Sequence, residues 1–482
     1  MNNLKILLVS AEVDPFAKSG GLADVAGSLP IELKKMGHDV RVVMPRYKSI
    51  QAEMKYVTDF PVKMLGKEET CIIREGKIKD DDIDVPIYFV DNYHYFNREG
   101  MYCYGDDPDR FTFMDKAVLE MLPKIGFQPD IMHLNDWQAA AVALLLKEKY
   151  KKHFYYTDIS TVYTVHNLQY QGNYGKECLG LLDLGEEYFT PERLECYGQV
   201  NYMKAGLLYS DIINTVSNTY VEEIKTQEYG EKLEGVVKTR ENDLYGIING
   251  IDMKVYNPET DEKIFNKYNV DSIELKKENK RKLQEELGLP ETDCAMLGIV
   301  TRLVDQKGLN LVGDILDDLV KNNNIQLVVL GLGDPYYENM FKNFAEKYPK
   351  KVSANIEFND ELAHKIYAAS DMFLMPSRFE PCGLGQLIAL RYGTVPVVRQ
   401  TGGLADTIQD FKIESEEGNG FSFKDFNCRS LMKTMVRALS IYKNMPDLWE
   451  KIVKRGMQED YSWKTAADKY VELYDKAIEK KL

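Results

Sequence analysis

Short runs of apolar residues alternate along this chain with longer segments in which apolar residues recur every three or four positions. The short runs are typical of buried β-strands, and the longer segments are typical of amphipathic helices. Their alternation predicts an α/β fold built from βαβ units with right-handed crossovers and parallel strands. The predicted strands are Lys5–Val9, Val40–Met44, Ile87–Val90, Ile131–Leu134, Ser160–Val165 and Ile212–Val216 in the first half, and Ala295–Val300, Gln326–Leu330, Val352–Phe358, Met372–Met375 and Val395–Val398 in the second.

Two successive sets of strands predict two doubly wound, Rossmann-like domains, which fits a length of 482 residues. Glycine, an Asn-Gly pair and a proline interrupt the pattern between the two sets. We therefore expect a first domain over 1–244, a hinge over 245–258 and a second domain over 259–456. The remaining segment, 457–482, carries one apolar stripe from about Trp463 and predicts a further packing helix.

Composition narrows the classes of partner. The chain has 61 lysines and arginines against 76 aspartates and glutamates, a net charge of −15. Such a chain repels nucleic acid and anionic lipid, so neither is expected as a partner. The apolar run near the N-terminus is too short for a signal peptide, and no run reaches the roughly twenty residues of a membrane span. The seven scattered cysteines include no Cys-x-x-Cys pair, which favours a reducing cytoplasm over a disulfide framework or a zinc site.

A glycine pair near the N-terminus is the first candidate site. Lys18 precedes Gly20 and Gly21, which follow the first predicted strand and open a helix. Glycines let a backbone approach a ligand closely, and a helix start offers unpaired N–H groups to phosphate. A tight turn without function would have the same sequence. The same five letters, Gly-Gly-Leu-Ala-Asp, recur at 402–406, again after a strand.

Two cations follow the first strand of the second half. Arg302 and Lys307 lie directly after Ala295–Val300. Because ligands of open α/β sheets collect at the carboxyl ends of strands, these cations are placed to neutralise a departing diphosphate without a metal. The alternative is a pair of surface cations that cap a loop.

A carboxylate and a helix start follow another strand of the second half. Glu380 comes after Met372–Met375 and is placed to accept hydrogen bonds from sugar hydroxyls. A role as a helix-dipole partner is the alternative for Glu380. Because no redox partner follows Cys382, its thiol is not expected to be a nucleophile. The backbone amides expected to receive phosphate oxygens are those of Cys382, Gly383, Leu384 and Gly385.

Polar residues also terminate two strands of the first half. Asp136 and His166 follow Ile131–Leu134 and Ser160–Val165, so both are expected at the same sheet edge as Lys18. Either residue is equally well explained as a satisfied structural group. No third and fourth ligand lie at usable spacing, so we expect no metal site here.

In this order, the motifs resemble those of the bacterial glycogen synthase and plant starch synthase family over essentially the whole chain. One departure is small: Ser19 stands where the family usually has threonine, and it keeps the hydroxyl. The motifs that carry the resemblance are Lys18–Asp24, His133–Trp137, His166–Gly172, Asn249–Asp252, Arg302 with Lys307, Ser377–Leu384 and Thr401–Asp406.

The resemblance implies a GT-B architecture, two Rossmann-like domains facing across a cleft, and a retaining glucosyltransferase. It implies transfer of glucose from ADP-glucose to an α-1,4-glucan acceptor such as glycogen, without a cofactor or metal. By analogy, the diphosphate would be held by Arg302 and Lys307 from one domain and by Lys18, Gly20 and Gly21 from the other. The other implied roles are Glu380 for the glucose hydroxyls, His166 and Asn167 for the sugar pocket, Asp136 toward the acceptor, Asn249 for donor binding and Phe358 for stacking on adenine.

Two other functions fit the same residues. A sugar-nucleotide-binding regulator on this fold would bind the donor without turnover, although keeping Arg302, Lys307 and Glu380 together speaks against it. A retaining transferase that uses UDP-glucose or a different acceptor is the second alternative. The choice between a front-face reaction and a short-lived covalent intermediate stays open at this stage.

Overall fold

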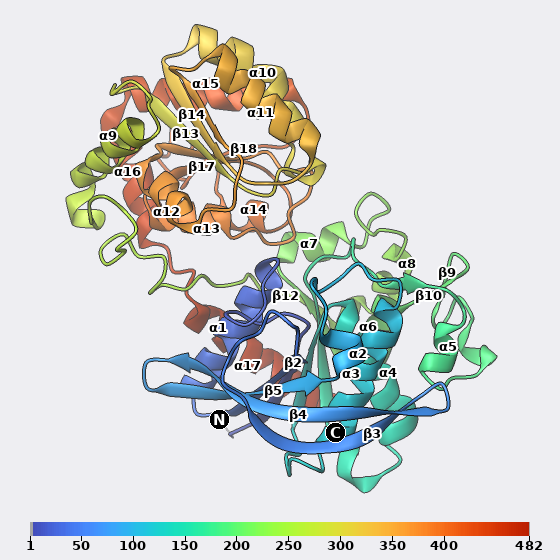
Figure 1. Cartoon of the computed structure of the whole chain (residues 1–482). Helices are drawn as coiled ribbons and strands as arrows, with labels where there is room; N and C mark the ends of the chain where they lie inside the picture. The colour runs from blue at the N-terminus through green and yellow to red at the C-terminus, as the bar shows by residue number, and fades with distance from the viewer. Residues whose placement is uncertain (1–2, 482) are drawn as a thin grey trace. The chain divides into compact units, whose positions relative to one another are not determined.

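The structure, a computed structural model, describes residues 3–481. The chain forms two compact units, one comprising residues up to Gly250 together with Trp463 onward, and the other comprising Ile251–Ser462. Each unit contains a twisted sheet with helices on both faces (Figure 1). No helix among residues 3–481 is long and apolar enough to cross a membrane.

Unit 1 is built on a nine-stranded sheet of order β12-β11-β7-β6-β1-β2-β5-β4-β3. Its central strands β1, β6 and β7 are buried on both faces, which explains why they read as unbroken apolar runs. The strands are β1 (Lys5–Val9), β2 (Asp39–Pro45), β3 (Lys55–Met64), β4 (Lys67–Asp80), β5 (Ile83–Asp91), β6 (Ile131–Asn135), β7 (Ser160–Val165), β11 (Ile212–Thr215) and β12 (Leu244–Gly246), with a small separate sheet of β8 (Asn173–Tyr174), β9 (Glu195–Cys196) and β10 (Gln199–Asn201).

The sequence-based expectation of parallel strands is wrong at one edge of this sheet. β3 and β4 form a long antiparallel hairpin, which Figure 1 shows in blue, and β4 pairs antiparallel with β5. The hairpin has one solvated face, so polar residues alternate with apolar ones and no continuous apolar run marks it. Its two-residue turn, Leu65-Gly66, has positive φ at both residues but lacks the usual Asn-Gly signal.

The helices of unit 1 cover both faces of the sheet. The C-terminal helix α17 packs against α1 and belongs to this unit, although some 210 residues of unit 2 separate it from the rest (Figure 1). The helices and helical turns are α1 (Gly21–Lys35), α2 (Tyr93–Phe96), α3 (Asp107–Met121), η1 (Trp137–Ala139), α4 (Ala140–Leu145), η2 (Leu146–Tyr150), η3 (Phe154–Tyr156), α5 (Cys178–Leu181), η4 (Glu186–Tyr188), α6 (Tyr202–Tyr209), α7 (Asn218–Glu223), α8 (Glu234–Thr239), η5 (Glu241–Asp243) and α17 (Trp463–Glu479).

Hydrogen bonds anchor α17 to the sheet of unit 1. Tyr474 Oη lies 2.9 Å from His133 Nδ1, and His133 Nε2 lies 2.6 Å from Thr164 Oγ1. Burial lowers the pKa of His133 to about 3, so the imidazole is neutral at neutral pH. A row of aromatic and small side chains on α17 completes the apolar core of the unit.

Unit 2 contains a six-stranded, all-parallel sheet of order β15-β14-β13-β16-β17-β18. Numbered along the chain, this is the 3-2-1-4-5-6 order of dinucleotide-binding folds. Its elements are η6 (Val270–Leu275), α9 (Lys276–Glu286), β13 (Ala295–Val300), η7 (Asp305–Lys307), α10 (Leu309–Asn322), β14 (Ile325–Leu330), α11 (Pro335–Lys347), β15 (Val352–Asn355), α12 (Asp360–Ala369), β16 (Met372–Met375), α13 (Gly385–Arg391), β17 (Val395–Arg399), α14 (Gly402–Thr407), β18 (Phe421–Phe423), α15 (Cys428–Asn444) and α16 (Pro446–Gln458).

Candidate functional site

Each large sheet has a topological switch point, where the chain leaves its first strand toward one side and later returns to pair on the other side. In unit 1 this switch point lies between β1 and β6, and in unit 2 it lies between β13 and β16. Ligands of open α/β sheets bind at the carboxyl ends of strands at such a point, because the loops diverge there. The loops that follow these four strands carry Lys18, Asp136, Arg302 with Lys307, and Glu380.

In unit 1 the structure brings Asp136 and His166 into contact. The backbone N–H of His166 donates to Asp136 Oδ1 at 2.8 Å. Asp136 has a φ of 55°, which is unusual for a residue other than glycine and holds its carboxylate at the strand end. The His166 ring is fixed by Asn135, whose amide nitrogen donates to Val9 O and whose oxygen lies 2.9 Å from His166 Nε2. His166 Nε2 therefore carries the proton, and Nδ1 is the acceptor.

The two side chains have strongly shifted pKa values. Burial raises the pKa of Asp136 to about 7, and the charge of Glu12 acts in the same direction, while backbone hydrogen bonds from His166 and Asn167 oppose the shift. Burial lowers the pKa of His166 to about 3. At neutral pH the site thus holds a neutral imidazole beside a carboxyl group that is close to its titration midpoint.

Lys18 lies in the loop between β1 and α1. Its ammonium forms an ion pair of 2.5 Å with Asp24 Oδ1 in the first turn of α1, and its side chain is 43% exposed. Burial raises the pKa of Asp24. Gly20 has an extended conformation that any residue can adopt, and a Cβ added to it would meet nothing within 4 Å. Neither its conformation nor the packing of described residues explains why glycine stands there.

The second Gly-Gly-Leu-Ala-Asp copy has a different environment. Gly402 has a φ of 44°, and a Cβ there would lie 2.0 Å from the Glu380 carbonyl oxygen. The N–H of Gly403 donates to that same oxygen at 3.1 Å. This copy follows β17, the fifth strand of its sheet, whereas the first copy follows β1, so the two are not topologically equivalent. The glycines at 402 and 403 support the loop that carries Glu380.

In unit 2 the structure brings Lys307 and Glu380 together. Lys307 Nζ lies 2.7 Å from Glu380 Oε2, and both side chains are largely buried, with exposures of 15% and 8%. Ser377 Oγ donates to the same oxygen at 3.0 Å. Both bonds fall on Oε2, and no side chain among residues 3–481 donates to Oε1. Arg302 is exposed, and its side chain forms no hydrogen bond or ion pair with another described residue.

The remaining predicted residues of unit 2 lie on the neighbouring loops. Cys382 is buried, and its carbonyl and that of Gly383 accept hydrogen bonds from Gln386 Nε2 at 3.1 and 2.9 Å. The expected strand Val352–Phe358 is too long, because β15 ends at Asn355. Phe358 instead lies in the loop before α12 and is 89% exposed, so its ring face is open to a ligand.

Asn249 lies near the end of the first segment of unit 1. Its side chain is 5% exposed, and its Oδ1 is buried without a hydrogen-bond partner among residues 3–481. An acceptor of this kind normally has a partner, because leaving it unpaired costs about 1–3 kcal/mol. A ligand donor is one way to satisfy it.

Sequence reasoning missed several residues that hold these loops. In unit 1, Glu12 accepts from Ser19, the neighbour of Lys18, and Tyr102 donates to Glu12. In unit 2, Ser377 donates to Glu380, and Arg399 donates to the Ser377 carbonyl. Ser377 lies within the Ser377–Leu384 motif, but its side chain was given no role, and Glu12 lies six residues before the Lys18–Asp24 motif. Tyr102 lies on another loop and Arg399 is the last residue of β17, so no spacing along the chain could indicate them.

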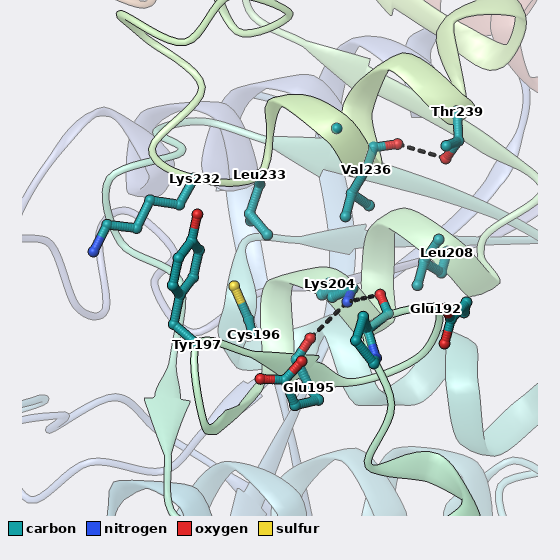
Figure 2. A pocket seen from close by; sticks show the side chains of 12 residues that line it. Glu192, Glu195, Cys196, Tyr197, Lys204, Leu208, Lys232, Leu233, Val236 and Thr239 are labelled. Carbon is teal, nitrogen blue, oxygen red and sulfur yellow. Dashed lines mark hydrogen bonds between the residues drawn. The ribbon is translucent and has the colours of Figure 1, made fainter.

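A separate cavity of about 650 Å³ lies in unit 1 and contains none of the predicted site residues (Figure 2). Lys204 Nζ, on its wall, donates to the carbonyls of Pro191 and Glu195, so this cation already has partners. Tyr197 and Lys232 stand at one side, with the ammonium 5.0 Å from the ring centroid. No group of three or more His, Cys, Asp or Glu residues in the described part of the chain is placed to hold a metal ion.

Two family models together match most of the chain. Residues 5–239 match the family model described as starch synthase catalytic domain, and residues 279–456 match glycosyl transferases group 1. The glycogen synthase of Desulforudis audaxviator is 52% identical over 487 residues, which cover 99% of this chain and 97% of that protein. The glycogen synthase of Thermotoga maritima is 48% identical over 486 residues, 99% of each chain.

Solved structures with the same fold include a starch synthase and a sucrose-phosphate synthase. The catalytic domain of starch synthase IV from Arabidopsis thaliana, bound to ADP and acarbose, superimposes with a TM-score of 0.92 at 33% identity, over 99% of this chain and 100% of that one. Sucrose-phosphate synthase from Thermosynechococcus elongatus shares the fold alone, with a TM-score of 0.60 at 18% identity over 98% of each chain.

The fold and these likenesses define a glycosyltransferase with two Rossmann-like domains, the GT-B architecture. Within that class, the chain belongs to the glycogen synthase and starch synthase family. The family, the fold class and the enzyme class expected from the sequence are thereby confirmed.

Proposed function

We propose that this protein transfers glucose from ADP-glucose to the 4-hydroxyl at the non-reducing end of an α-1,4-glucan, with retention at the anomeric carbon. The observation that carries the proposal is identity of about half over almost the full length to glycogen synthases. The starch synthase that superimposes over the whole chain binds ADP and the sugar analogue acarbose, which supports an adenine nucleotide and a glucan.

In unit 2, Lys307 and Arg302 would bind the diphosphate. During transfer the bond between the anomeric carbon and the β-phosphate oxygen breaks, and a bond to the acceptor oxygen forms. Negative charge grows on the diphosphate, and the hydroxyl proton of the acceptor passes to a phosphate oxygen of the departing diphosphate. A fixed ammonium stabilises that charge more in the transition state than in the ground state, which raises the rate. The Glu380 bond to Lys307 holds this cation in place before the donor binds.

The other groups of unit 2 would recognise the rest of the donor. Oε1 of Glu380 would accept from glucose hydroxyls, and the amides from Cys382 to Gly385 would receive phosphate oxygens. The exposed ring of Phe358 suits stacking on adenine.

In unit 1, Lys18 with the Gly20 and Gly21 amides would bind donor phosphate. The Asn249 Oδ1, which has no partner among residues 3–481, would accept a hydrogen bond from a hydroxyl or amino group of the donor. The Nδ1 lone pair of His166 would accept from a sugar hydroxyl, with Asn167 beside it. Asp136, whose pKa lies near neutrality, would lie toward the acceptor. A cytoplasmic setting is consistent with seven cysteines that are all free thiols.

The direct test is release of nucleoside diphosphate when the purified protein is given glycogen with ADP-glucose, and in parallel with UDP-glucose. We expect ADP release that depends on glycogen, and a kcat/KM at least about tenfold higher for ADP-glucose. Donor binding without release of ADP would show a regulator instead of an enzyme. A preference for UDP-glucose would contradict the assigned nucleotide.

A further inference from the structure

A buried carboxylate lies beneath the loop that carries Lys18. Glu12 is 4% exposed and lies in the segment between β1 and α1. Ser19 donates to it twice, from its backbone N–H to Oε2 at 2.5 Å and from its hydroxyl to Oε1 at 2.6 Å. Tyr102 Oη donates to Oε1 at 2.7 Å. Three donors thus satisfy a charge that would otherwise be costly to bury.

The two bonds of Ser19 also orient the loop residues on either side of it. Ser19 stands between Lys18 and Gly20, and both of its donors point inward to the carboxylate. Ser19 and both neighbours are exposed residues: the Lys18 side chain is 43% exposed, and the space beside the Gly20 Cα is open. A two-point attachment fixes the orientation of a loop as well as its position, because one bond would still allow rotation.

We propose that Glu12 is a positioning residue, which holds Ser19 from within so that the loop presents Lys18 and the glycine amides to the diphosphate of the donor. The inference rests on the proposed function of that loop. Glu12 touches no substrate in this scheme, so its effect on the reaction passes through Ser19. Loss of the attachment leaves the cation on a mobile loop, and the donor must then order the loop when it binds.

The surroundings of Glu12 support a role beyond local packing. Its charge is among the causes that raise the pKa values of both Asp24, the partner of Lys18, and Asp136. Glu12 is therefore electrostatically coupled to the Lys18 loop on one side and to the end of β6 on the other. A neutral replacement should shift the pH dependence of Asp136 to lower pH, which a purely structural residue would not do.

The test is a double-mutant cycle on steady-state kinetics. We expect Glu12→Gln and Ser19→Ala each to raise the KM for ADP-glucose about tenfold, the effect of one lost charge-assisted hydrogen bond. The KM for glycogen should change less than about twofold. Ser19→Thr keeps the hydroxyl and should behave as the parent. Glu120→Gln is the matched control. The Glu120 carboxylate, like that of Glu12, accepts a hydrogen bond from a tyrosine, here from Tyr150 Oη at 2.6 Å.

The decisive comparison uses Lys18→Ala as background. If Glu12 acts through the loop, adding Ser19→Ala or Glu12→Gln to Lys18→Ala should raise the donor KM by less than about twofold further. An equal tenfold rise in both backgrounds, or an unchanged donor KM in folded Ser19→Ala, would overturn the inference. If Glu12→Gln fails to fold, the comparison of Ser19→Ala with Ser19→Thr still tests the inference. A normal donor KM for Lys18→Ala itself would instead contradict the proposed function of the loop.

Discussion

The backbone N–H of His166 donates to Asp136 Oδ1 across 2.8 Å, so the carboxylate at the end of β6 is tied to the end of β7. Burial raises the pKa of Asp136 to about 7 despite this bond. We expect kcat/KM to show an inflection near pH 7 that is absent in Asp136→Asn. The measurement is a pH–rate profile of both proteins between pH 5.5 and 9 at subsaturating acceptor. An inflection that persists in the variant would assign it to another group.

The same shift predicts an effect on stability. The folded-state pKa of Asp136 lies above its ordinary value of 3.8. The folded protein therefore binds this proton more tightly than the unfolded chain, and its contribution to stability is lost as pH rises from about 4 to about 7. Between pH 5 and pH 8 the parent should therefore lose stability relative to Asp136→Asn. Urea unfolding at pH 5 and pH 8 measures this difference.

The Lys307–Glu380 ion pair makes a kinetic prediction. Lys307→Ala removes a cation assigned to the leaving diphosphate, so kcat should fall about 10²–10³-fold while donor binding weakens much less. Lys347→Ala breaks a surface ion pair of the same 2.7 Å length with Asp317 and is the control, with kcat expected within about twofold. Single-turnover kinetics and isothermal titration with ADP separate the two effects. A normal kcat for Lys307→Ala would remove Lys307 from the mechanism.

The sequence was sufficient for the fold wherever strands are buried on both faces. Runs such as Lys5–Val9, Ser160–Val165 and Ala295–Val300 coincide with β1, β7 and β13. The β3–β4 hairpin was missed because half of its residues face solvent and its turn is Leu65-Gly66. Pattern alone therefore locates core strands and overlooks edge strands, whose polarity resembles that of loops.

The sequence could predict those candidate residues that lie directly after a strand. Lys307 and Glu380 each follow a central strand, and the sheet order brings them to one switch point. Their supporting contacts depend on tertiary structure. The bond from Tyr102 to Glu12 joins residues 90 positions apart, and the contact between His133 and Tyr474 spans 341. Such pairs leave no local pattern in the sequence, so only the folded structure reveals them.

The contact between His133 and Tyr474 predicts how α17 is held. Tyr474→Phe keeps the ring and removes the hydroxyl, which leaves His133 Nδ1 without this buried partner. We expect the free energy of unfolding to fall by about 1–2 kcal/mol at pH 7. Because burial lowers the pKa of His133 to about 3, the parent itself should lose stability as pH falls from about 6.5 toward 3. Denaturant titrations at several pH values check both statements.

The two Gly-Gly-Leu-Ala-Asp copies provide a matched pair of substitutions with opposite consequences. In Gly402→Ala the new Cβ would lie 2.0 Å from the Glu380 carbonyl oxygen, on a backbone with a φ of 44°. A clash with backbone and a left-handed conformation together should destabilise the protein by about 3 kcal/mol. Thermal unfolding of unit 2 should occur at lower temperature, and a variant as stable as the parent would show that the loop can shift.

In Gly20→Ala the new Cβ meets nothing within 4 Å, and the backbone is extended, so the free energy of unfolding should change by less than about 0.5 kcal/mol. If the open space serves the donor, the added methyl group should raise the KM for ADP-glucose about tenfold, because the backbone amides can no longer approach the phosphates closely. A normal donor KM in this stable variant would indicate that the first copy, despite its open surroundings, binds no donor. The pair thus separates a glycine required by packing from one required by a ligand, within the same five-residue motif.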